Sequence, residues 1–202
     1  GLELLTAAAD QASIAIGRFR LLAVQHTLLA TERRRADEQQ ALLATLADLS
    51  AELELSKLLQ AVLERAAALM GAPAGELATV DEATGDLLVV ANHNTGAVST
   101  GARLKVGEGA MGHVARTREP LIIEDYRRWT GRSAQYAGVD ARAVLVVPLL
   151  MGGRLVGALS VWHTNPERRF GAADLALVAL FAPQAAVAIE NARLFTAARR
   201  QK

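Results

Sequence analysis

The chain has 202 residues, and its 22 Lys and Arg residues nearly balance 21 Asp and Glu residues, for a formal charge of +1. Hydrophobic residues make up 51% of the chain, which is enough for a packed core and excludes a disordered protein. The balanced charge excludes a general attraction to nucleic acid or to an acidic membrane surface, and the absence of cysteine excludes disulfides, thiolate metal ligands and cysteine nucleophiles in this chain.

Apolar stretches in the sequence are short. Each is interrupted by a charged or polar residue before it reaches the length of about 18 residues that a membrane span needs. We therefore expect no membrane contact from this chain and a cytoplasmic location.

Glycine and proline divide the chain into three parts. Residues 2–70 contain one glycine and no proline, residues 71–171 contain 14 of the 16 glycines, and residues 172–202 contain one proline and no glycine. Because helix interiors exclude both residue types and turns collect them, this distribution predicts a long helix, a turn-rich domain and a second long helix.

The first part carries apolar side chains at helical spacing along two seams, of which the second runs from Leu22 to Leu53. Residues 31–40 are too polar to be buried. A helix of this kind is stable only where its apolar stripe meets a partner. We interpret residues 26–52 as a helical linker and coiled-coil candidate, and we expect a homodimer through the flanking helices. A single helix packed on its own domain is the alternative.

An internal repeat links the two ends of the chain. Residues 2–22 align without a gap with residues 175–195, with nine identities in 21 positions. We interpret residues 1–25 as the closing helix of a preceding domain of the same kind. Chance similarity between two helices rich in alanine and leucine is the alternative.

The middle part alternates strand patterns with turn signals and predicts an α+β domain. Gly71-Ala72-Pro73 ends the first helix, and Gly152-Gly153 forms a tight hairpin turn. The predicted elements, in chain order, are a helix over 53–70, strands over 76–81 and 87–93, a short helix within 107–117, a strand over 121–124, a long loop over 125–141, strands over 143–150 and 154–163, and a final helix over 172–199.

The last predicted hairpin is apolar on both faces. Val144 and Val146 point to one side, and Leu145 and Val147 point to the other. A half-exposed sheet alternates polar and apolar residues, so both faces of this sheet must be covered. The flanking helices can cover one face. Only the loops over 94–141 remain for the other face, which predicts a small cavity beneath them.

An ordered series of motifs runs through residues 50–198. It consists of LKVGEGAMGHVA at 104–115, EPLIIED at 119–125, VLVVPLL at 144–150, GRLVGALSV at 153–161, Phe170 with Asp174, and AAVAIENARLF at 185–195. In this order the motifs resemble a GAF domain, which we place at residues 53–198. The resemblance implies a central antiparallel sheet with helices on one face and a loop-covered pocket on the other. Residues 1–25 then resemble the closing helix of a preceding GAF domain.

The resemblance also implies a function. It suggests a regulatory module of a bacterial signalling protein such as a sensor histidine kinase, with a kinase or cyclase output domain outside this chain. We expect a sensory module that binds a small molecule and relays the signal through dimeric flanking helices, without enzymatic activity of its own. A ligand-free module for structural dimerisation and signal relay is the alternative.

Ligand classes that the resemblance suggests match this chain poorly. Bilin pigments are usually attached to cysteine, so a covalent bilin is excluded, as is the cysteine-dependent reduction of free methionine sulfoxide. The signature of cyclic-nucleotide binding matches only in part, because Asn165 is followed by Pro166, and Asp174 by Leu175.

Three histidines, His93, His113 and His163, lie near the predicted cavity. A neutral imidazole can bind haem iron or a metal ion. The long spacings between these residues do not predict a metal site, and hydrogen-bonded histidines at the rim are the favoured interpretation. The glycines at 107, 109 and 112 match a dinucleotide fingerprint by letters only, so we expect them to allow a tight entry into the short helix.

The loop over 125–141 is basic and contains aromatic residues. It could form a lid that contacts an anionic ligand through Arg127, Arg128, Arg132 and the adjoining Arg142, and an exposed flexible loop is the favoured alternative. We assign no catalytic residue and no metal ligand. The candidate pocket residues are Val90, His93, Met111, Val114, Tyr126, Trp129, Tyr136, Val144, Val146 and Val161.

Overall fold

The computed structural model describes residues 2–95 and 100–200, and it describes side chains from Glu32 onward apart from single positions in the helices. Its first element is α1, a helix from Leu2 to Met70. The chain divides into two compact units, Gly1–Ser50 and Ala51–Lys202. The first apolar seam and the repeat helix fall on side chains outside the described ones, so both interpretations stay predictions.

The described side chains of the first unit are mostly exposed. Leu42, Leu46 and Leu49 each expose more than half of their surface. Arg34 donates to Glu38 at 2.9 Å, one helical turn away, which supports the helix locally. The three leucines are spaced by four and three residues and so form one stripe, which contributes to stability only where a partner covers it.

The second unit is built around an antiparallel sheet of six strands in the order β3-β2-β1-β6-β5-β4. Both predicted hairpins are confirmed, since β1 pairs with β2 and β5 pairs with β6. Gly152 and Gly153 have φ values of 56° and 81°, which a two-residue hairpin turn of this kind requires. The strands are β1 Ala74–Val80, β2 Leu87–His93, β3 Arg103–Leu104, β4 Leu121–Ile123, β5 Val144–Met151 and β6 Arg154–Trp162.

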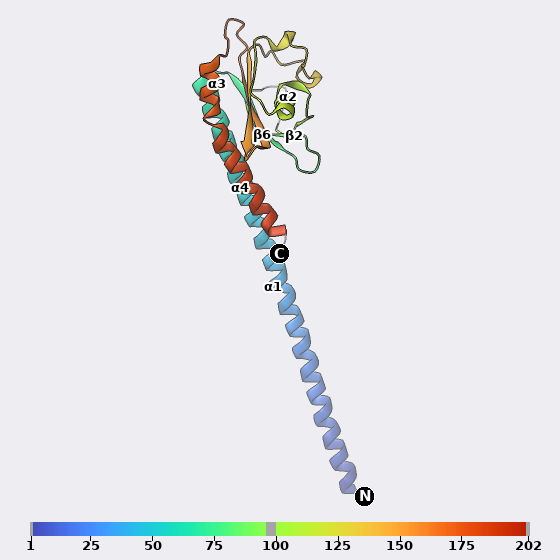
Figure 1. Cartoon of the computed structure of the whole chain (residues 1–202). Helices are drawn as coiled ribbons and strands as arrows, with labels where there is room; N and C mark the ends of the chain where they lie inside the picture. The colour runs from blue at the N-terminus through green and yellow to red at the C-terminus, as the bar shows by residue number, and fades with distance from the viewer. Residues whose placement is uncertain (1, 96–99, 201–202) are drawn as a thin grey trace. The chain divides into compact units, whose positions relative to one another are not determined.

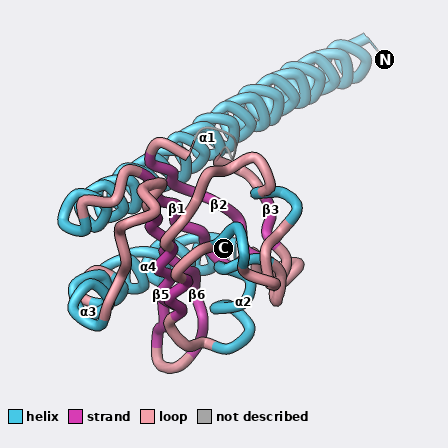
Figure 2. The backbone as a smooth tube through the Cα atoms, turned by 90° about the horizontal axis from the view of Figure 1, so that it is seen from above, coloured by secondary structure: helices cyan, strands magenta, loops and turns pink. Residues whose placement is uncertain are grey.

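Different layers cover the two faces of the sheet (Figure 1). Residues 51–70 of α1 pack on one face together with α3, Ala172–Ala179, and α4, Ala182–Arg200, around the fully buried Leu63 and Leu145. Figure 2 shows α2, Gly109–Thr117, on the other side of the strands from α3 and α4. The predicted arrangement, an α+β fold with helices on one face and loops over the other, is confirmed.

The predicted final helix is interrupted. It divides into α3 and α4 at Leu180 and Phe181, whose backbone N–H groups donate to the carbonyls of Leu177 and Val178 in tighter turns. Pro183 has no N–H to continue the helical pattern, and its ring would clash with the carbonyl four residues earlier. One proline therefore ends α3 and begins α4.

The segment Ala172–Phe195 differs from the expectation that no apolar stretch is long enough to span a membrane. By length and composition alone, this one segment of the described residues could do so. Val178, Ala185 and Ala186 within it are fully buried against the sheet. In this structure the segment therefore forms part of the core of the second unit, and its apolar composition follows in part from that role.

An ion-pair cluster joins α4 to the sheet. Glu190 accepts from Arg193 at 2.6 Å and also from Arg154, the first residue of β6. Arg193 reaches Glu82, in the turn between β1 and β2, at 3.3 Å. Hydrogen bonds first from Arg193 and then from Arg154 lower the pKa of Glu190 to about 2. The cluster therefore holds α4 to the start of β6 and to the first hairpin.

Candidate functional site

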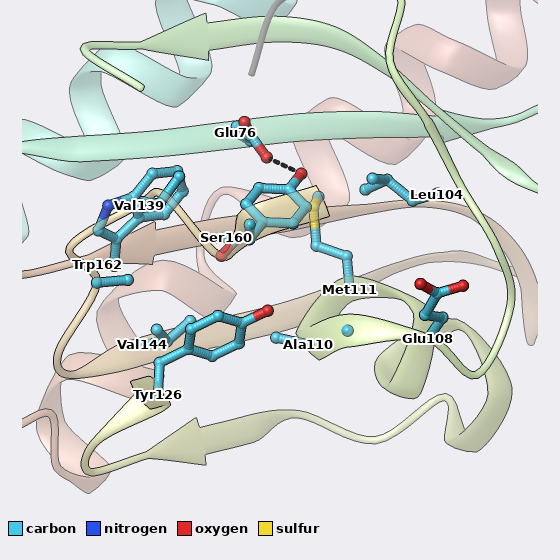
Figure 3. A pocket seen from close by; sticks show the side chains of 13 residues that line it. Glu76, Leu104, Glu108, Ala110, Met111, Tyr126, Val139, Val144, Ser160 and Trp162 are labelled. Atoms are coloured by element: carbon cyan, nitrogen blue, oxygen red, sulfur yellow. Dashed lines mark hydrogen bonds between the residues drawn. The ribbon is translucent and has the colours of Figure 1, made fainter. Parts of the chain in front are cut away.

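A cavity lies on the α2 face of the sheet, between strands and loop (Figure 3). The loop over 124–143 carries two short 3-10 helices, Tyr126–Arg128 and Ala134–Tyr136, and covers the cavity. The part of the cavity that the centre of a water molecule can occupy has a volume of about 30 Å³. This is room for about two water molecules. The lining residues are Glu76, Leu104, Glu108, Gly109, Ala110, Met111, Tyr126, Tyr136, Val139, Ala141, Val144, Ser160 and Trp162.

Glu76 is the most unusual residue of the lining. It lies in the middle of β1 and is only 1% exposed. The hydroxyl of Tyr136 donates to its Oε2 atom at 2.6 Å, whereas the buried Oε1 atom has no hydrogen-bond partner among the described residues. Burial raises the pKa of Glu76 to about 7, an effect that the Tyr136 hydrogen bond partly offsets. A carboxyl group in this setting changes its charge near neutral pH.

Strand pairing sets which side chains surround Glu76. Its partner on β6 is Ser160, and its partner on β2 is Asn92. Side chains directly opposite each other on antiparallel strands point to the same face, so Ser160 lies beside Glu76 on the cavity side. Ser160 is itself only 3% exposed. The sheet therefore presents a carboxyl and a hydroxyl group next to each other.

A second polar group lies where α2 begins. Glu108 accepts from the hydroxyl of Ser133 at 3.0 Å, and the backbone N–H of Ser133 donates to the hydroxyl of Tyr126 at 3.3 Å. Burial raises the pKa of the Tyr126 hydroxyl above its ordinary value. These contacts fix the covering loop against α2, with the Glu108 carboxylate at the edge of the cavity.

The glycines of 107–112 position α2, as the sequence predicts. A Cβ atom on Gly112 would lie 2.2 Å from the carbonyl oxygen of Lys105, and Gly107 donates to the carbonyl of Gly112 at 2.7 Å. Gly109 has a φ of 68°, in the left-handed region that favours glycine. The spacing therefore serves a close backbone approach that brings the first turn of α2 to the cavity.

The structure brings some of the candidate residues together and separates others. Met111, Tyr126, Tyr136 and Val144 line the cavity. Val114 and Val146 are buried in the same apolar cluster, and Trp129 packs against it, but these three lie outside the lining. His93 is the last residue of β2 and lies outside the lining as well.

Val90 and Val161 require a correction, because both contribute to the core on the helix-covered face. Leu77 pairs with Ala91, and the next residue, Ala78, pairs with Val89, so Val90 is the extra residue of a bulge. Val161 pairs with Leu145, a residue of the helix-covered face. Simple alternation along each strand could not reveal the bulge or the register.

The basic loop does not direct its arginines into the cavity, and the lid for an anionic ligand is not supported. Arg127 lies 3.6 Å from Asp125, and both Arg127 and Arg142 pair with Asp140, at 3.8 and 3.3 Å. Arg132 donates to a backbone carbonyl of the same loop. These arginines stabilise the loop from outside.

The three histidines lie apart in different settings. The amide of Asn94 lies 3.2 Å from the ring of His93, and the ring of His113 meets Trp129 edge-on at 5.9 Å. His163 is buried beside Phe170, and desolvation lowers its pKa. Within the described residues, no three His, Asp or Glu side chains come together as a possible metal site.

Sequence reasoning missed Glu76 and Ser160. Each is a polar residue flanked by apolar residues in the buried part of its strand, Glu76 in Ala74–Val80 and Ser160 in Arg154–Trp162, and this interruption was the available signal. A charged residue in a buried strand is rare unless it is paired or functional. The residues that lie next to Glu76 and Ser160, however, could be identified only after the strand order was known.

Comparisons with known proteins agree with this fold. A family model described as a GAF domain matches residues 52–190. A comparison with curated proteins finds no match.

Among solved structures, the GAF domain of a phosphoenolpyruvate-protein phosphotransferase from Coxiella burnetii is 23% identical, with a TM-score of 0.63 over 74% of this chain and 96% of that one. The second GAF domain of DevS from Mycobacterium smegmatis is 25% identical, with a TM-score of 0.56 over 73% of this chain and 99% of that one. A free methionine-R-sulfoxide reductase from Neisseria meningitidis, solved with its substrate, is 18% identical, with a TM-score of 0.57 over 73% and 88%. Proteins with this fold thus include an enzyme as well as domains of larger proteins. Because the family model matches more than half of the chain, the chain belongs to the GAF domain family.

Proposed function

We propose that this GAF domain is a sensory module that binds a small molecule in the cavity between the sheet and the covering loop. The observation that carries the proposal is the buried Oε1 atom of Glu76, which lines the cavity without a hydrogen-bond partner among the described residues. Leaving a buried acceptor unpaired destabilises a protein unless a ligand or water completes it. This unpaired acceptor supports a ligand that donates a hydrogen bond to Glu76.

A route for relaying the signal follows from β6. This strand carries Ser160 and Trp162 in the cavity lining, and its first residue, Arg154, pairs with Glu190 on α4. A ligand that moves β6 would thus act on α4 through a direct ion pair. Binding that favours one position of α4 changes the equilibrium between the positions of that helix.

The proposed assembly is a homodimer through the flanking helices. On α4, Val187 and Leu194 are 47% and 51% exposed, and Leu180 just before it is 66% exposed. Val187 and Leu194 are seven positions apart and so follow one line along α4, and Leu180 precedes Val187 by the same spacing across the break from α3. We place the module in a cytoplasmic bacterial signalling protein such as a sensor histidine kinase, and we assign it no catalysis of its own.

The alternative, a ligand-free relay, is favoured by one observation. Met111, Tyr126, Tyr136 and Trp162 restrict the cavity to room for about two water molecules. In this alternative the domain pairs and spaces helices, and water satisfies Glu76.

Native mass spectrometry of the purified chain tests the two functions. A sensor gives a dimer with additional mass, and Ala141→Val, whose two added methyl groups match the free space of the cavity, removes that mass without changing the dimer. Ala137→Val is the matched control, because Ala137 lies in the same loop but is exposed and outside the lining. A dimer of bare mass that also binds no compound in a metabolite screen would contradict the sensor and favour the relay.

A further inference from the structure

The chemistry of the cavity lining is one-sided. It contains two carboxyl groups, from Glu76 and Glu108, and none of its residues is Lys, Arg or His. Its other polar side-chain groups are the hydroxyls of Ser160, Tyr126 and Tyr136 and the indole N–H of Trp162. An anion placed here would meet two carboxyl groups and no cationic side chain. The lining therefore selects for a ligand that donates hydrogen bonds or carries positive charge.

The start of α2 does not reverse this selectivity. The N-terminal end of a helix favours anions, and Gly109, Ala110 and Met111 from the first turn of α2 line the cavity. Glu108, however, is the N-cap residue of α2 and lines the cavity, and its carboxylate makes no cap hydrogen bond but accepts from the Ser133 hydroxyl. An anion at this helix end would therefore meet a carboxylate of the protein itself.

The arrangement around Glu76 matches an ammonium group. The Oε1 atom of Glu76 is a buried acceptor without a partner in the described structure, and Ser160, its partner across the strands, offers a hydroxyl oxygen on the same face. Tyr136 holds the other carboxyl oxygen at 2.6 Å, which fixes the orientation of the group. The rings of Tyr126 and Trp162 supply apolar walls, and aromatic faces attract organic cations.

We propose that the cavity binds a compact primary amine in its ammonium form, with Glu76 Oε1 and the Ser160 hydroxyl accepting from the ammonium group and the aromatic residues enclosing its apolar part. This inference rests on the proposed sensory function and names its ligand class. The small size of the cavity limits the ligand to a few carbon atoms unless the covering loop moves outward.

Three probes of similar size and different charge test the ligand class. They are ethylammonium, ethanol and acetate, titrated separately into the full chain and followed by two-dimensional NMR of backbone amides. The expected result is that ethylammonium shifts the resonances of residues around the cavity at lower concentration than the other two. Equal or tighter binding of ethanol or of acetate would overturn the proposal.

Glu76→Gln tests the residue. It keeps the size of the side chain and its hydrogen bond from Tyr136 but removes the charge, so the affinity for ethylammonium should fall about tenfold or more. The affinity for ethanol should stay the same. Glu124→Gln is the matched control, since Glu124 is exposed and outside the lining. Unchanged affinity for ethylammonium in Glu76→Gln would overturn the proposal, and if that variant does not fold, the comparison of the three probes still decides.

The failure of this inference is distinguishable from the failure of the sensory function. If native mass spectrometry detects a neutral or anionic compound bound in the cavity, the domain is a sensor and the ligand class is wrong. If no compound binds at all, both the ligand class and the sensory function are wrong.

Discussion

The carboxyl group of Glu76 makes the stability of the protein depend on pH. Its pKa is about 7 in the folded protein, against 4.5 for an ordinary glutamate. Between these values the folded state holds a proton that the unfolded chain has lost. The stabilising effect is therefore fully present below pH 4.5 and is lost as the pH rises through 7.

Glu76→Gln should remove this dependence. We expect the wild type to lose about 3 kcal/mol of unfolding free energy relative to the variant between pH 5 and pH 8, as urea titrations would measure. The wild type is compared with the variant because His163, whose pKa is lowered, changes the stability of both proteins with pH in the opposite direction. Two parallel curves across this range would contradict the assignment.

The groups that face Glu76 determine how its pKa responds to mutation. Tyr136 and Tyr126 face it from the covering loop and Glu108 from the start of α2, whereas Ser160 and Asn92 on the neighbouring strands do not titrate. Of these residues, Tyr136 lowers the pKa of Glu76 through its hydrogen bond.

Tyr136→Phe should therefore raise the pKa of Glu76 further. The pH at which the folded protein releases this proton should move upward, because the phenyl ring fills the same space but donates no hydrogen bond. Carbon-detected NMR of the Glu76 carboxyl group measures the midpoint directly. Tyr126→Phe is the control, since Tyr126 has no hydrogen bond to Glu76, and an unchanged midpoint in Tyr136→Phe would show that the hydrogen bond has no effect.

At the scale of single elements, α2 depends on the close approach of two backbone segments. Gly112→Ala places a Cβ atom 2.2 Å from the carbonyl oxygen of Lys105, which cannot move without breaking the turn before α2. We expect a loss of about 2 to 3 kcal/mol, measured by thermal or urea unfolding. Gly138→Ala is the control, because nothing lies within 4 Å of its Cβ position, and its effect should stay within about 0.5 kcal/mol. Equal stability of the two variants would contradict this account.

The elements differ in how well the sequence predicts them. Hairpins with glycine turns and alternating strands, such as β5 and β6, are local and were predicted to within a residue or two. The two residues of β3 carry no periodic signal, and their pairing with β2 depends on tertiary contacts. The break between α3 and α4 had a visible cause in Pro183, whose effect the apolar periodicity of the segment concealed.

The residues of the cavity were likewise predictable only where local sequence patterns determine their position. Its location under the loops was predictable from the apolar faces of the last hairpin, and four of the candidate residues line it. Val90 and Val161 were misplaced because a bulge and a strand register decide which face each occupies. Glu76 could not be predicted as a site residue, because its hydrogen-bond partner Tyr136 is 60 residues away in the sequence.

For the whole molecule, the exposed line on α4 predicts an interface between two copies. Val187→Ser combined with Leu194→Ser should convert the proposed dimer to monomer at micromolar concentration, because burying such apolar side chains drives association. Sedimentation or light scattering measures the change. Leu150→Ser removes a residue that is 38% exposed at the hairpin and serves as the control. A dimer that survives the double substitution would place the interface elsewhere.

Removal of residues 1–40 tests the other part of the assembly. Leu43, Leu46 and Leu53, the last members of the predicted seam, are more than half exposed, and the truncation removes the earlier turns of that seam. We expect weaker dimerisation, because a short helical stripe buries little apolar area. The sheet domain should keep its thermal stability, and an unchanged dimer constant would assign the whole interface to the second unit.

The separation of the two cores by one sheet has a consequence for how this protein can change. Substitutions on opposite faces lie in different cores, so their effects on stability should add, and a library that varies Met111, Val139 and Ala141 should be open to screening for ligands without changing the proposed dimer. The sheet itself resists variation: a Cβ on Gly157 would lie 2.3 Å from the carbonyl oxygen of Ala78. The proposed ligand recognition and the proposed dimer interface should therefore diversify separately around a strand framework that must remain constant.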